Sequence, residues 1–248
     1  MNYFFKILTI FFYLSNVIYC QHRNIKSIEL FDLKSGKEKI IYDINDDIML
    51  SFDNLNSTAQ DFYLEIEHND YKWNKSVIRK NEFLTGYDDV RIKNYKNSYN
   101  TIQDYINYQV NLSNNEFKIK ESGNYKIIVN DENGNLIFEE KLIIKEKNST
   151  GVIEITRTDN INYSESSHQL KVTMPCNSCQ INSNQFDYVM VIYKNNNLNN
   201  PFILYEPDYS LAGNFIYDNL IFNAGSEYLN FDNSKVLDSS SEIMEVRI

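Results

Sequence analysis

The chain has 248 residues, which is long enough for two domains of ordinary size. Its net charge of −10 excludes the basic surface that binding to nucleic acid or to anionic lipid headgroups requires. Aromatic residues make up 14% of the chain, which supplies the volume of a packed core and argues against disorder. Only 7 glycines and 3 prolines are present, so asparagine, aspartate and serine must form most of the turns.

Residues 1–20 have the pattern of a signal peptide for export. Lys6 provides the positive charge, and the mostly apolar stretch Ile7–Ile18 is shorter than the ~20 residues that a transmembrane helix needs. Cys20 has two interpretations: it is the last residue before ordinary cleavage, or it carries a lipid that anchors the protein to a membrane. The large Tyr19 before it favours plain cleavage, because lipid attachment usually follows a small residue.

Strand patterns dominate residues 21–147, which we predict to form an N-terminal β-sandwich. Along Phe62–His68 and Ile106–Leu112, apolar and polar side chains alternate, so that one face of each strand can enter a core. Asp131–Gly134 ends in Asn-Gly, the strongest short signal of a hairpin turn. About seven strands without a helix predict an antiparallel sandwich of immunoglobulin type. The other predicted strands include Ile25–Phe31, Lys39–Ile44, Gly123–Asn130 and Leu136–Lys145.

A short polar linker, Lys145–Gly151, separates this domain from a second one over residues 151–248. The second domain repeats the strand-and-turn style without a sequence repeat, and we predict another immunoglobulin-like β-sandwich. An asparagine-rich loop is expected at Asn195–Asn200. The candidate strands are Val152–Thr158, His168–Met174, Asp187–Lys194, Phe202–Glu206, Gly213–Tyr217, Glu227–Phe231 and Ile243–Ile248.

Cys176 and Cys179 form a Cys-x-x-Cys motif directly after Pro175. A redox site of the thioredoxin kind would place the pair at the start of a helix, whereas the surrounding sequence predicts strands and turns. A zinc site would need a second pair of ligands, and the remaining cysteine lies in the signal segment. A local disulfide that staples a turn is the favoured interpretation in an oxidising compartment, and two free thiols are the alternative.

Aromatic residues supply the candidate partner contacts. Trp73, the only tryptophan, is either a core residue of the sandwich, which is the commoner role, or an anchor for a protein partner. A cluster of tyrosines between residues 87 and 108 forms either an aromatic sheet face or a binding surface. We select Trp73, Tyr87 and Tyr99 as the candidate contacts. His68 lies in the apolar register of its strand, which favours a core-edge histidine bonded to a neighbour.

No catalytic motif is recognisable in the sequence. Adjacent carboxylates such as Asp88–Asp89 point to opposite faces of a strand, whereas glycosidases need two carboxyls ~5–10 Å apart across a cleft. There is no nucleophile elbow, phosphate loop, dinucleotide fingerprint or histidine metal motif. We therefore predict no catalytic residue, no cofactor and no metal site, and hence a protein that is not an enzyme.

Several short motifs, taken together, resemble the first domain of the plug proteins of the type IX secretion system. They occur in the family's order: Leu50–Leu55, Tyr63–His68 leading to Trp73 and Ser76, Leu84–Tyr87, Ser98–Thr101, Tyr105–Tyr108, Ser122–Tyr125 and Phe222–Tyr228. The chain departs from the family's pattern at Asn69, Asn107 and Ser226. Members usually continue for a further stretch, so we expect either a truncated chain or a short paralogue.

The resemblance implies a non-enzymatic periplasmic protein, associated with the outer membrane, that seals the periplasmic side of the translocon channel. Its implied partner is the outer-membrane translocon barrel protein. The chain would be peripheral to the membrane, or anchored to it if Cys20 carries lipid. The alternative is a carbohydrate-binding or adhesin-like β-sandwich, which would use the same tyrosine-rich stretch to stack against sugars.

Overall fold

The computed structural model describes residues 24–56, 58–87, 89–114, 117–146, 150–175 and 188–224. Contacts divide the chain into two compact units. The first comprises the chain up to Lys147 together with Tyr193–Pro201, and the second comprises Asn148–Ile192 together with the chain from Phe202. The predicted signal peptide, Cys176, Cys179 and the last two expected strands lie outside the described residues.

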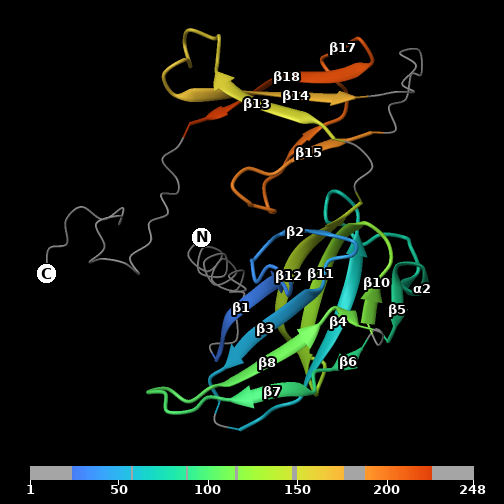
Figure 1. Ribbon diagram of the computed structural model, residues 1–248, viewed down its shortest axis with the longest axis vertical. Helices are drawn as coiled ribbons and strands as arrows, with labels where there is room; N and C mark the ends of the chain where they lie inside the picture. The colour runs from blue at the N-terminus through green and yellow to red at the C-terminus, as the bar shows by residue number, and fades with distance from the viewer. Residues whose placement is uncertain are drawn as a thin grey trace, which may run out of the picture. The chain divides into compact units, whose positions relative to one another are not determined.

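Two main sheets face each other in the first unit (Figure 1). The first is antiparallel, with the order β1-β3-β8-β7, and the second has the order β2-β12-β11-β4-β6, in which only the β2–β12 pair is parallel. The strands of the first sheet are β1 (Ile25–Asp32), β3 (Ile48–Asn54), β8 (Ile106–Asn111) and β7 (Asn94–Asn97). Those of the second are β2 (Ile41–Asp43), β12 (Leu136–Lys145), β11 (Gly123–Asp131), β4 (Phe62–Asn69) and β6 (Val90–Arg91).

Alternate residues of these strands fill the space between the two sheets. Phe62, Leu64 and Ile66 on β4 are at most 2% exposed, as the period of two predicts. Three tyrosines with no exposed surface lie in the same core, and a buried hydroxyl is costly unless it is hydrogen-bonded. Each donates to a backbone carbonyl: Tyr42 to Leu30 at 2.7 Å, Tyr108 to Gln60 at 3.0 Å and Tyr125 to Glu121 at 2.7 Å.

A smaller sheet and one helical turn complete this unit. The sheet order is β5-β10-β9, and the turn α2 (Lys80–Phe83) precedes it, although the sequence predicts no helix. The side chain of Glu82 caps α2 by accepting a hydrogen bond from the Arg79 amide at 3.1 Å. A single turn is too short for a helical period to appear in the sequence. The small strands are β5 (Leu84–Gly86), β10 (Phe117–Ile119) and β9 (Ser113–Asn114).

Strands also form the second unit. One antiparallel sheet has the order β13-β14-β18-β17, and two short strands, β15 and β16, pair with each other. Its core is small and centres on Leu170, Val172, Phe215 and Tyr217. The strands are β13 (Val152–Arg157), β14 (Ser167–Pro175), β18 (Asn214–Asn223), β17 (Tyr209–Leu211), β15 (Met190–Ile192) and β16 (Phe202–Leu204).

The predicted all-β class is confirmed, whereas the immunoglobulin-like strand order stays a prediction. Strand boundaries agree best where the alternation is long: the expected Leu136–Lys145 coincides with β12. The expected Gly213–Tyr217 is only the first part of β18. Within the described ranges, no helix is long and apolar enough to cross a membrane.

Candidate docking site

The connection between β7 and β8 presents apolar side chains to solvent on a well-defined loop. The Ser98 amide donates to the Tyr105 carbonyl at 2.9 Å, and the Ser98 hydroxyl accepts from the Tyr105 amide at 3.0 Å. Asn100 takes a left-handed φ of 57°, which asparagine tolerates. Tyr99 is 94% exposed, and Ile102 is fully exposed. Backbone hydrogen bonds therefore hold this loop while its two apolar side chains remain available for contact.

Tyr95 lies at the base of the same loop and connects it to the core. It is paired directly with Tyr108 across the β7–β8 ladder, and the two ring centroids are 5.4 Å apart. Tyr108 has no exposed surface and stacks on Phe52, with 5.2 Å between centroids, whereas Tyr95 is half-exposed. We call Tyr99 and Ile102 the hairpin tip, which Tyr95 connects to the core. Sequence reasoning missed Ile102, because a single isoleucine in a polar turn carries no periodic signal.

Tyr87 belongs to a different part of the surface. It follows β5 and is 76% exposed. Two further apolar residues, Val77 and Ile78, are exposed just before α2. In Figure 1, α2 and β5 lie on the opposite side of the first unit from the end of the β7–β8 hairpin. Tyr87 and Tyr99 are thus exposed, as a contact residue must be, but they do not form one patch.

Trp73 is half-buried in the turn after β4. Its φ of 66° is left-handed, which is rare for a bulky residue. The Lys141 Nζ atom lies 4.8 Å from the centroid of its ring, within the range of a cation–π contact. The indole Nε1 atom is buried and makes no hydrogen bond of normal geometry. Trp73 therefore lies at the margin of the fold, partly in contact and partly exposed.

His68 is buried at the end of β4 and bonded on both sides. Its Nδ1 atom lies 2.7 Å from the Ser76 hydroxyl, and its Nε2 atom lies 3.3 Å from the Ser122 carbonyl. A carbonyl only accepts, so Nε2 carries the proton and Nδ1 accepts from Ser76. The ring packs against Phe83 and Tyr125, with centroids 5.5 and 5.0 Å away. This arrangement fixes the ring as part of the core and leaves the Ser–His pair without an orienting carboxylate.

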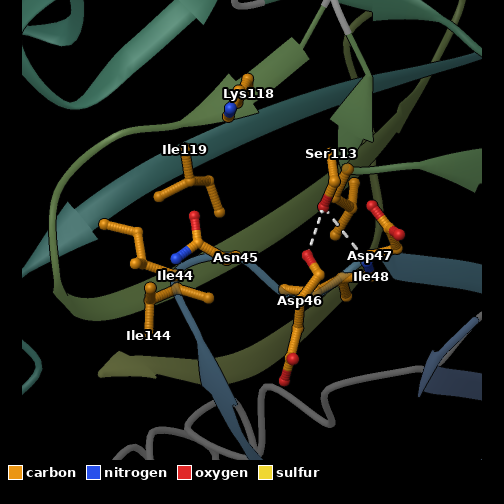
Figure 2. A pocket seen from close by; sticks show the side chains of 10 residues that line it. Ile44, Asn45, Asp46, Asp47, Ile48, Ser113, Lys118, Ile119 and Ile144 are labelled. Atoms are coloured by element: carbon orange, nitrogen blue, oxygen red, sulfur yellow. Dashed lines mark hydrogen bonds between the residues drawn. The ribbon is translucent and has the colours of Figure 1, made fainter. Parts of the chain in front are cut away.

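Figure 2 shows a small cavity beside the β2–β3 connection. Two hydrogen bonds join Ser113 to this connection: its hydroxyl accepts from the Ile48 amide at 3.1 Å and donates to the Asp46 carbonyl at 2.9 Å. The volume is about 80 Å³, well below the several hundred that a small-molecule site needs. Isoleucines and Leu112 form one part of its lining, and polar side chains form the rest, namely Asn45, Asp46, Asp47, Ser113 and Lys118. Its volume is too small for a small-molecule ligand.

A larger groove of about 570 Å³ lies at the end of the sandwich where the β3–β4 and β11–β12 turns meet. Its amide side chains bond one another: Asn54 and Asn56 both donate to the Gln60 side chain at 2.9 Å. Phe62, the aromatic residue of its lining, is buried. Across the described part of the chain, no group of three or more histidine, cysteine or acidic residues could hold a metal ion.

These features define a class of protein. The described residues form an all-β chain, with one helical turn, that exposes apolar side chains on its loops. Residues 25–146, just under half of the chain, match the family described as "Type 9 secretion system plug protein 1st domain". The resemblance noted in the sequence is confirmed, and the family is not one of enzymes.

The fold is similar to that of a solved structure. It is a hypothetical protein from Parabacteroides merdae ATCC 43184, determined at 2.30 Å resolution, with a TM-score of 0.76 and 24% sequence identity. The match covers 84% of this chain and 54% of that one, so the chain spans about half the length of that protein. At this identity the likeness establishes the fold alone. No curated protein matches the chain.

Proposed function

We propose that the chain is an exported, non-enzymatic plug that seals the periplasmic side of the type 9 secretion channel. The observation that carries this proposal is the family match over residues 25–146. The physical requirements are modest, because a seal needs bulk and fit rather than chemistry. A pre-formed sandwich loses little conformational entropy on docking, and a stable seal should bury ~1,000 Å² or more.

The proposed contacts with the channel are Tyr99, Tyr87 and Trp73, now joined by Ile102. Exposed aromatic and large apolar side chains carry much of the binding energy of protein interfaces. The hairpin tip has a further advantage, because its loop is already ordered and little freedom is lost when it binds. We place the protein in the periplasm against the outer membrane, with the translocon barrel as its partner.

Affinity capture tests this proposal. The tagged chain, purified from envelope extracts, should bring down an outer-membrane barrel protein identified by mass spectrometry. The same spectra should contain the N-terminal peptide, which distinguishes cleavage before Gln21 from a lipid on Cys20. Deletion of the gene should let a normally excluded large probe enter the periplasm. Capture of no barrel protein, together with unchanged probe entry, would contradict the sealing role.

The carbohydrate-binding alternative receives less support from the geometry. A sugar site needs an exposed aromatic ring beside planar polar groups. The large groove offers the amides of Asn54, Asn56 and Gln60, but Phe62 in its lining is buried. The exposed Tyr87 and Tyr99 line neither this groove nor the small cavity. Binding of the purified chain to a glycan array would favour this alternative over the plug.

A further inference from the structure

Two asparagines on the outer face of the second sheet are buried although their register points them away from the core. On β4, Ile66 and His68 face inward, so Asn69 faces outward, and it pairs with Asn124 of β11. The outer face of such a sheet normally meets water. Asn69 is nevertheless only 1% exposed and Asn124 only 8%. Something must therefore cover this end of the face.

The turn after β4 covers both residues, because Asn124 Nδ2 donates to the Asp70 carbonyl at 3.0 Å and Asn69 Nδ2 donates to the Trp73 carbonyl at 3.4 Å. The segment Tyr193–Pro201, which belongs to the first unit by its contacts, lies against the same region. Asn199 accepts a hydrogen bond from Lys141 of β12 at 2.9 Å, and the same Lys141 ammonium lies over the Trp73 ring. The Tyr193 hydroxyl faces the side chains of Asn124 and Trp73, and its burial raises the pKa of that hydroxyl. We call this segment the strap. Its contacts are with β12, with β11 and with the turn after β4.

The shape of the strap is set by its own sequence. Asn195 and Asn196 take successive left-handed φ values of 52° and 58°, which asparagine adopts more readily than most residues. Leu198 is only 7% exposed, so the strap buries one apolar side chain while its neighbours stay in solvent. A turn of this kind is pre-formed and loses little freedom when it docks.

The covered surface also has two buried polar atoms that lack a hydrogen-bond partner of normal geometry. Asn69 Oδ1, an acceptor, and Trp73 Nε1, a donor, are both buried without a hydrogen bond of normal geometry. Each such atom is costly unless a partner approaches it. The Tyr193 hydroxyl faces Trp73 and can accept from Nε1, whereas no group of the described chain reaches Asn69 Oδ1 with normal hydrogen-bond geometry.

We propose that Trp73, Asn124 and Lys141 form a recognition surface, the Trp73 face, for a tyrosine-led turn, and that the strap occupies this surface in the resting protein. Release of the strap uncovers Trp73 for a protein partner. The strap and the channel then compete for the same tryptophan, which gives the plug a bound state and a released state. Only this competition depends on the proposed function; the docking of the strap does not.

The single tryptophan makes the test direct, because all indole fluorescence comes from Trp73. Tyr193→Phe removes only the hydroxyl, and Asn199→Ala removes the bond to Lys141. In the full chain we expect both variants to raise acrylamide quenching and to shift emission to longer wavelength. Loss of one hydrogen bond to a charged group should raise the open population about tenfold. Asn200→Ala is the matched control, since Asn200 is exposed and lies next to Asn199.

The outcomes distinguish docking of the strap from competition between the strap and the channel. Equal quenching of the parent, Tyr193→Phe, Asn199→Ala and Asn200→Ala would overturn the strap, whatever the channel experiment gives. Amide hydrogen exchange provides a second measurement. Faster exchange at residues 193–201 in Asn199→Ala, but not in the control Asn200→Ala, supports docking of the strap. If the strap is released but capture of the barrel protein does not increase, the competition is refuted while the strap remains. Increased capture by Asn199→Ala supports the whole proposal.

Discussion

Single residues in this protein are constrained chiefly by side chains that pack closely against the backbone and by buried polar groups. Gly123 illustrates both, because it starts β11 next to the ring of His68. A Cβ atom added there would lie 2.3 Å from His68 Nε2, and its φ of 152° is one that residues with a side chain rarely adopt. Only glycine therefore fits at position 123 while the His68 ring packs against it.

Gly123→Ala should destabilise the first unit by about 1–3 kcal/mol, the usual cost of forcing extra volume into a packed site. Urea denaturation followed by Trp73 fluorescence measures the change. Gly134→Ala is the control, since Gly134 also has a positive φ, of 78°, but its Cβ would meet no atom within 4 Å. Equal costs for the two variants would show that backbone strain, and not the contact with His68, decides the effect.

Asp32, a buried carboxylate at the start of an exposed turn, makes the stability of the fold depend on acid pH. Its carboxylate accepts from the Ser35 hydroxyl at 2.7 Å and lies 3.4 Å from Lys39 Nζ. The Ser35 hydrogen bond, helped by the Lys34 amide and by Lys39, lowers the pKa of Asp32 from 3.8 to about 2. Because the folded pKa is the lower one, this stabilisation is complete above pH 4 and is lost as the pH falls toward 2.

Asp32→Asn should therefore flatten the pH dependence of unfolding between about pH 4 and pH 2, as linkage requires. Urea midpoints at several pH values measure it. The parent should lose stability across this window, and the variant should start lower at neutral pH and change less. A parent and a variant with parallel curves would show that Asp32 does not contribute.

At the scale of elements, the β7–β8 hairpin separates a structural role from a binding role. Tyr108 points into the core and Tyr95 lies over it, while Tyr99 and Ile102 are exposed beyond the ladder. Substitution at the exposed positions should leave the fold intact, because exposed side chains seldom change stability by more than about 0.5 kcal/mol.

The double variant Tyr99→Ser/Ile102→Ser should keep the parent's melting temperature and lose capture of the barrel protein by tenfold or more, the order expected when interface anchors are removed. Tyr87→Ser is the comparison on the other side of the unit. Loss of capture only with Tyr87→Ser would move the proposed contact to the α2–β5 side. Unchanged capture with both variants would leave Trp73 as the contact to test.

For the whole molecule, two cores of unequal size predict two unfolding events. The larger core joins both main sheets of the first unit around Phe52, and the smaller one surrounds Val172 in the second. Trp73 reports on the first unit only. Chains with separate cores commonly unfold in more than one step.

Phe52→Ala should shift the Trp73 transition by about 3–5 kcal/mol, the usual cost of deleting a buried phenylalanine. Val172→Ala should leave the Trp73 fluorescence transition unchanged. It should shift only the part of the circular dichroism transition that comes from unfolding of the second unit. A shift of the Trp73 transition by Val172→Ala would show that the two cores unfold together.

Alternation and turn chemistry were sufficient to predict the long strands. β12 appears with the predicted bounds, and Asn133-Gly134 forms the expected hairpin turn, with Gly134 at positive φ. β7 was missed because all four of its residues are exposed, and a strand with no buried face has no alternation to read. The motifs between Leu50 and Tyr125 that resemble the plug family were likewise readable from the sequence, and the family match covers them, whereas Phe222–Tyr228 lies outside the matched residues.

Tertiary structure alone decided which outward residues are covered. The sequence places Asn69 and Asn124 on a polar face, and nothing local predicts that the turn after β4 bonds and buries them or that the distant segment Tyr193–Pro201 joins the first unit. Periodicity reports the direction of a side chain relative to its own strand, and this is a local property. Burial depends on which other part of the chain arrives, and that is set by contacts between residues far apart in sequence.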